Sequence, residues 1–149
     1  MINIPEQLSM AVHTLAALAA DPGVPRSGRE IAEAHGWSHN HLAKVQARLV
    51  HAGLVKSRCG KAGGILFTRK PGKVTLAMIR DAVCGAPSKS KYCLLPGKVC
   101  PGNRCALGRF ITKMEAEFKH AFARTTLADI LRDIQPKKRV KKPVLPKRK

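Results

Sequence analysis

Apolar side chains recur every three or four residues through the first twenty positions of the chain, which is the spacing of one face of an α-helix. The members of this face are Leu8, Ala11, Val12, Leu15, Leu18 and Ala19. The sequence Asp21-Pro22-Gly23 then interrupts the pattern with strong helix breakers. A first helix is therefore predicted to end at this point.

Two shorter helices are predicted next. Ser27 can cap the first of them, Glu30 at the third helical position completes a capping box, and Gly36 ends it. Ser38 is the N-cap candidate of a helix that runs to about His51, with one apolar face formed by Leu42, Val45 and Leu49. Two short helices joined by a tight glycine-containing turn are typical of a helix-turn-helix.

Past Gly53, two short runs predict a β-hairpin. Residues 54–57 and residues 65–68 combine apolar and β-branched side chains as paired strands do. The tip between them is rich in glycine and carries Arg58, Cys59 and Lys61. A basic hairpin directly after a helix-turn-helix is typical of a wing, so the predicted fold is mainly α, a winged helix-turn-helix with a two-stranded wing.

The second half of the chain predicts three further helices. Residues 74–83 have helical spacing with Thr75 as the cap, and Cys84 after this apolar helix is expected to be a buried small hydrophobe. Residues 85–104 show no helical period. A long apolar stripe then follows, and Thr126 can cap a last short helix. The stripe consists of Leu107, Phe110, Ile111, Met114, Phe118, Ala121 and Phe122.

A helix as long as this stripe has little core of its own to pack against beside a small winged domain. We therefore expect it to pair with a second subunit in a homodimer, with packing onto the same chain as the alternative. The expected organisation is a DNA-binding domain over residues 1–84 and a cysteine-bearing sensor loop over residues 85–105. A dimerisation helix with a short terminal helix follows over residues 106–135, and a disordered basic tail over residues 136–149.

The net charge of +19 identifies the class of partner. Eight of the 28 basic residues lie in the tail, and the remaining 20 still exceed the 9 acidic residues by 11. The body of the protein is therefore basic and should attract a polyanion. An aromatic content of 4% argues against base-stacking surfaces for single strands or RNA and favours duplex DNA. The alternative is that the basic residues only confer solubility.

Other classes of protein are excluded more simply. The chain has an odd number of cysteines, no apolar run of membrane-spanning length and no basic-then-apolar leader, which predicts a reducing cytoplasm. No nucleophile with its base, phosphate-cradling loop or catalytic carboxylate pair is present, so we do not expect an enzyme.

Three cysteines in the sensor loop form a candidate metal site. Six residues separate Cys93 from Cys100 and four separate Cys100 from Cys105, close enough for one compact centre to reach all three thiols. The spacing lacks the Cys-x-x-Cys pairs that are typical of zinc ribbons.

The third helix carries the candidate DNA contacts. In a winged helix this element enters the major groove, where outward polar residues meet base edges and phosphates. Those residues here are Ser38, His39, Asn40, His41, Lys44 and Arg48, joined by Arg58 and Lys61 from the wing. A solvated helix face is the alternative reading. With two subunits, the DNA site should be pseudo-palindromic.

Taken together, these segments resemble the Rrf-two (Rrf2) family of bacterial winged-helix regulators over about residues 7–131. The resemblance is carried by Ser27 with Glu30-Ile31-Ala32, Ser38 with Leu42 and Lys44-Val45, Ala52-Gly53-Leu54-Val55, Gly63-Gly64, Thr75-Leu76 and Thr126-Leu127-Ala128-Asp129-Ile130. Within the family, Asn40-His41-Leu42 and Gly63-Gly64-Ile65 look more like the nitric-oxide-sensitive repressor branch (NsrR) than the iron-sulfur cluster regulator branch (IscR).

The resemblance implies a homodimeric transcriptional repressor that senses nitric oxide, redox state or iron-sulfur status. Cys93, Cys100 and Cys105 match the family's ligands for a 4Fe-4S or 2Fe-2S cluster, although the middle cysteine is displaced by one residue. Ser9 stands where the nitric-oxide-sensing branch has a carboxylate ligand, and Leu107 where the other branch has a histidine. The candidate fourth ligands are therefore His13 and Glu6.

Two departures from the family concern DNA. Ala43 replaces a base-reading glutamate of the iron-sulfur regulator branch, and Cys59 replaces the usual arginine of the wing. Arg58 or Lys61 can supply the missing charge, and Cys59 beside these cations is alternatively a redox-reactive thiol.

Two other functions stay open at the level of sequence. One is a cluster-free regulator in which loop cysteines form a disulfide on oxidation. The other is a winged-helix module that binds RNA or protein.

Overall fold

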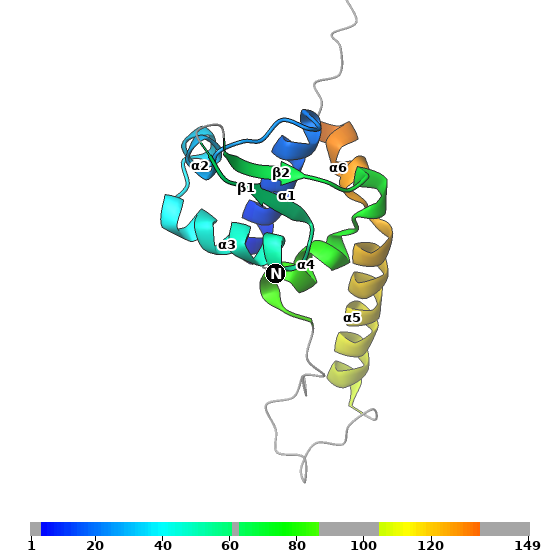
Figure 1. Cartoon of the computed structure of the whole chain (residues 1–149). Helices are drawn as coiled ribbons and strands as arrows, with labels where there is room; N and C mark the ends of the chain where they lie inside the picture. Colours follow the sequence, from blue (N-terminus) through cyan, green and yellow to red (C-terminus); the bar gives the residue numbers. More distant parts are fainter. Residues whose placement is uncertain (1–3, 61–62, 87–104, 135–149) are drawn as a thin grey trace, which may run out of the picture.

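The computed structural model describes residues 4–60, 63–86 and 105–134, which form a winged helix-turn-helix with a long helix along one side (Figure 1). The winged part contains α1 (Glu6–Ala20), α2 (Gly28–His35), α3 (His39–His51), β1 (Val55–Arg58), β2 (Gly64–Phe67), the 3-10 helix η1 (Pro71–Lys73) and α4 (Leu76–Cys84). It is followed by α5 (Ala106–Arg124) and α6 (Leu127–Ile134). The predicted fold class is confirmed, while the tail from residue 136 lies outside the described residues.

Local capping chemistry sets both ends of α2 where the sequence predicts them. The Ser27 side chain accepts a hydrogen bond from the Glu30 N–H, and the Glu30 carboxylate accepts one from the Ser27 N–H, which completes the capping box of α2. Gly36 ends α2 with a left-handed φ of 66°. Ser38 is the N-cap residue of α3 as predicted, although its side chain makes no capping hydrogen bond.

The wing is a two-stranded antiparallel sheet that is extended by a third segment. Val55 pairs with Phe67 and Arg58 with Gly64, so each strand is displaced by one residue from its predicted position. Arg26, just before α2, forms two backbone hydrogen bonds with Ile65, at 3.0 and 2.9 Å. The wing is therefore fixed to the entry of the helix-turn-helix.

One core holds the winged part together. Leu15 of α1, Leu49 of α3 and Ile79 of α4 are completely buried and belong to the same apolar cluster. Leu127 of α6 joins this cluster and is also completely buried. The start of α6 is also bonded to the segment before α4, because the Leu127 N–H donates a hydrogen bond of 2.8 Å to the Val74 carbonyl. The C-terminal helix is thus part of the core.

α5 differs from every other described α-helix because none of its residues is buried. Its C-terminal half contacts α4, where the Arg80 guanidinium lies 5.6 Å from the centre of the Phe122 ring. The Phe118 and Phe122 rings are 6.0 Å apart. Leu107 and Phe110 at the opposite end are 63% and 61% exposed. Among the described residues, the predicted stripe therefore packs on its own chain at its C-terminal end, and its N-terminal end is exposed.

Cys84 corrects a prediction, because it is exposed rather than buried. The apolar face of α4 passes through Ile79 and Val83, which are both buried. Cys84 is one residue beyond Val83, which rotates its side chain by about 100° away from that face. The Gln7 side chain instead donates a hydrogen bond of 3.5 Å to its sulfur.

Candidate nucleic-acid interface and metal site

One face of α3 is polar and exposed, while the opposite face is buried in the core. Leu42, Val45 and Leu49 fill the core, as the periodicity predicts. Five of the six helical candidates are exposed, and His41 is half-buried. The exposed five are Ser38, His39, Asn40, Lys44 and Arg48. The helix thus presents amide, imidazole and ammonium groups that can pair with base edges or phosphates.

Histidine and aromatic rings gather at the turn between α2 and α3. The His35 and Trp37 rings stack with their centres 4.3 Å apart, and the His13 ring lies 6.0 Å from His35 and 6.3 Å from Trp37. The Nδ1 of His35 donates to the Ile31 carbonyl at 2.9 Å. His13, a candidate fourth ligand, therefore contacts the turn of the helix-turn-helix within its own chain.

Glu6, the other candidate fourth ligand, is in the first turn of α1 and points toward α3. Its Oε2 lies 3.9 Å from Nδ1 of His41, and its side chain is 70% exposed. At this distance and exposure the pair adds little stability. The carboxylate is accessible for other interactions.

Arg48 faces inward despite its exposure. Its Nη1 donates to Oε1 of Gln7 at 2.7 Å and to the carbonyl oxygen of Val83. The residue therefore joins α3 to α1 and α4. These partners are 41 and 35 residues away along the chain, so no local sequence pattern predicts them.

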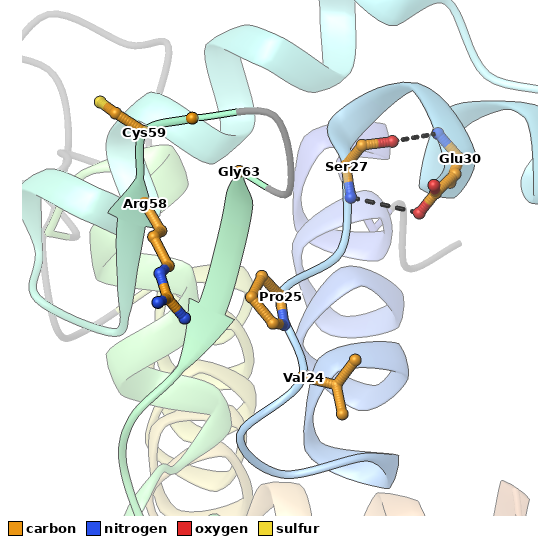
Figure 2. A pocket seen from close by; sticks show the side chains of 8 residues that line it. Val24, Pro25, Ser27, Glu30, Arg58, Cys59 and Gly63 are labelled. Atoms are coloured by element: carbon orange, nitrogen blue, oxygen red, sulfur yellow. Dashed lines mark hydrogen bonds between the residues drawn. The ribbon is translucent and has the colours of Figure 1, made fainter.

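The wing carries its candidate residues at the end of β1. The Arg58 and Cys59 side chains leave the strand in opposite directions, and both are exposed (Figure 2). They line a pocket of about 630 Å³ between the wing and the segment that leads into α2. Val24, Pro25, Ser27, Glu30, Gly60 and Gly63 complete its lining. Lys61 lies outside the described residues.

The candidate metal site is described only at its last ligand. Cys105 is half-buried and occupies the N-cap position of α5. Cys93 and Cys100 lie outside the described residues. Within residues 4–60, 63–86 and 105–134, no three His, Cys, Asp or Glu side chains are close enough to bind one metal ion. Among these residues, His13 and Glu6 therefore belong to no group of three metal-ligating side chains.

The arrangement of helix-turn-helix, wing and long helix matches known proteins. Residues 4–133 match the model of the Rrf2 family, which is described as an iron-dependent transcriptional regulator. The chain belongs to the Rrf2 family. In the part of the chain that the structure describes, no helix is both long and apolar enough to cross a membrane.

Among curated proteins, the chain is similar to the HTH-type transcriptional regulator BadM of Rhodopseudomonas palustris, with 42% identity over 65 residues. It is also 39% identical over 61 residues to the HTH-type transcriptional repressor NsrR of Streptomyces coelicolor. These matches cover 44% and 40% of this chain and only 42% and 41% of the two relatives.

Solved structures match over more of the chain. CymR of B. subtilis, the global cysteine regulator, has 25% identity and a TM-score of 0.70, with 89% of this chain and 98% of CymR covered. IscR of T. potens has 26% identity and a TM-score of 0.68, with 89% and 88% covered. The resemblance inferred from the sequence is confirmed at the level of the family.

Proposed function

We propose that this Rrf2 protein is a homodimeric, DNA-binding transcriptional repressor of the cytoplasm. The observation that carries DNA binding is the polar, exposed outer face of α3, held on a helix-turn-helix beside a basic wing. Ser38, His39, Asn40, His41 and Lys44 are the proposed contacts from α3, and Arg58 and Lys61 those from the wing. Asn40 suits adenine, and Lys44 suits phosphate or guanine.

The exposed end of α5 supports the homodimer. Leu107 and Phe110, together with Met114 at 38% exposure, form an apolar patch that the chain's own core leaves uncovered. A symmetric pair of α5 helices would cover this patch and would place two α3 helices for successive half-sites of a pseudo-palindromic operator.

We further propose that Cys93, Cys100 and Cys105 bind an iron-sulfur cluster. Three thiolates suit this group, since cysteine is its usual ligand. The similarity to NsrR and IscR also supports the assignment. His13 and Glu6 remain candidates for a fourth ligand, which the partner subunit could supply. When bound, the cluster would supply iron that reacts with nitric oxide or oxidants.

The described residues suggest how such a signal reaches DNA. Cys105 immediately precedes the first turn of α5, and α5 contacts α4 through Phe122 and Arg80. A change in the position of Cys105 would therefore be passed to α5 and to the winged domain. Operator affinity changes only if the two states of the thiols favour different arrangements of the dimer.

The cluster assignment is tested by anaerobic purification and analysis of iron, acid-labile sulfide and visible absorbance. We expect iron and sulfide in the wild type and their loss in Cys93→Ala, Cys100→Ala and Cys105→Ala. Cys59→Ser is the matched control, because this exposed thiol lies on the wing, and it should retain the cluster. Unchanged iron and absorbance in the triple alanine variant would contradict the assignment.

A second candidate function is a cluster-free thiol switch. It is favoured by the likeness to CymR, which is named a cysteine regulator, and by the exposed thiols of Cys59 and Cys84. A colourless protein without iron, whose DNA binding responds to oxidant and is restored by dithiothreitol, would support this function instead.

A further inference from the structure

Arg48 holds the C-terminal end of α4 through a carbonyl that the helix itself leaves unpaired. The last four carbonyls of an α-helix have no partner within it. The guanidinium of Arg48 donates to one of these, the carbonyl of Val83, and also brings a positive charge to the negative end of the helix dipole. An arginine of the third helix thus caps the fourth.

Gln7 completes the connection from α1. Its Oε1 accepts from Arg48 at 2.7 Å, and its Nε2 donates to Sγ of Cys84 at 3.5 Å. The amide therefore bridges a residue of α3 and the last residue of α4. Three hydrogen bonds join the three helices at this point. We refer to Gln7, Arg48, Val83 and Cys84 as the α4 clamp.

The position of the α4 clamp gives it a functional meaning. Gly85 ends α4 with a φ of 83°, and the chain continues from there toward Cys93. On the other side, Arg48 is one helical turn from Lys44, a proposed DNA contact. The clamp therefore connects the exit of α4 to the outer face of α3.

We propose that Arg48 is a positioning residue, which fixes the orientation of α3 against the last turn of α4 instead of contacting DNA itself. A displacement of that turn moves Val83 and Cys84, and the clamp carries the displacement to α3. This inference rests on the proposed DNA-binding function, and it replaces the expectation that Arg48 contacts DNA directly.

Two variants that introduce an uncharged methionine break the clamp from opposite sides. Arg48→Met removes both donations from α3, whereas Gln7→Met removes the bridge from α1, where no DNA contact is proposed. Lys44→Met serves as the comparison variant, because Lys44 is a proposed direct contact to DNA. Circular dichroism and thermal unfolding establish that each variant is folded.

The first readout is hydrogen exchange of the DNA-free protein. Both clamp variants should raise the exchange rates of the α4 last turn and of the C-terminal half of α3 by about tenfold or more, since a hydrogen bond to a charged group is lost. Exchange in the β1–β2 ladder, which the clamp does not touch, should be unchanged. Unaltered exchange in α4 for both variants would overturn the proposal.

The second readout is DNA affinity at several salt concentrations. The probes are a duplex selected from a random-sequence pool by the wild-type protein and a scrambled duplex of the same composition. Both clamp variants should lower the preference for the selected duplex by about tenfold, because a misplaced helix loses base contacts, and should keep the salt dependence of scrambled-duplex binding. Lys44→Met should reduce that salt dependence instead.

One result would overturn the proposal and identify Arg48 as a direct DNA contact. In that result, Arg48→Met lowers the affinity for both duplexes equally and reduces the salt dependence, while Gln7→Met has no effect on binding. A wild-type protein with no preference among duplexes contradicts the proposed function instead. The exchange measurement then still decides whether Arg48 couples the two helices.

Discussion

Gly64 is the position where the wing should tolerate a side chain least. A Cβ atom placed on Gly64 would lie 2.4 Å from the carbonyl oxygen of Arg26 and 2.7 Å from its carbonyl carbon. Both are backbone atoms, so no side chain can rotate away to make room. The Arg26 segment would have to move by roughly 1 Å to reach an ordinary contact distance.

This movement would disrupt the two backbone hydrogen bonds between Arg26 and Ile65. Each is worth about 1 kcal/mol net, so we expect Gly64→Ala to lower the free energy of unfolding by about 2–3 kcal/mol once strain is included. For a chain of this size the melting temperature should fall by about 6–10 °C. Arg58, which pairs with Gly64, would shift with the wing.

Urea unfolding followed by circular dichroism measures the change, with Gly72→Ala as the matched control. A Cβ on Gly72 meets only the Ala128 side chain, at 4.0 Å, so this variant should stay within about 1 kcal/mol of the wild type. Equal stability of Gly64→Ala and the wild type, or equal losses in both variants, would refute the argument from close backbone approach.

Three further predictions follow from the caps and from the exposed patch. Ser27→Ala should cost about 1 kcal/mol of unfolding free energy by thermal melting, because the capping box of α2 is lost. Hydrogen bonds from the Thr126 side chain and backbone, with the charge of Arg132, hold the pKa of Asp129 below its ordinary value. Asp129→Asn should therefore be less stable than the wild type at neutral pH, and the difference should vanish as the pH falls through that lowered pKa; a pH-independent difference would exclude this cause. Phe110→Lys should shift the protein from dimer toward monomer in sedimentation velocity, and an unchanged dimer would place the interface elsewhere.

The sequence predicted the helices well because their signals are local. Capping residues such as Ser27, Thr75 and Thr126 act within three positions of themselves, and all three side chains accept the expected hydrogen bonds. The apolar face of α3 follows from spacing alone, and it fixes which side of the helix is left for a ligand.

Features that depend on distant segments were not predictable in the same way. The strand register of the wing is set partly by Arg26, which pairs with Ile65 from 39 positions away, and the predicted strands were displaced by one residue. Cys84 looked apolar in sequence, but its position just past Val83 exposes it to Gln7. No pattern within α3 could indicate that Arg48 turns toward Val83.

The residues of the candidate site also differ in how far the sequence predicts their positions. The outer residues of α3 are placed as periodicity predicts, while His13 and Glu6 have neighbours at the helix-turn-helix that no spacing rule indicates. Cys93 and Cys100 lie outside the described residues, so their assignment rests on spacing and on the family.

The central claim is that the state of the loop thiols controls affinity for DNA. The most direct test is the dissociation constant of anaerobically purified protein for its selected duplex, measured by fluorescence anisotropy before and after stoichiometric nitric oxide. We predict that affinity falls by at least about tenfold, the lower range of allosteric coupling, and that Cys105→Ala abolishes the response. Equal affinity before and after nitric oxide, in protein shown to contain iron and sulfide, would contradict the account.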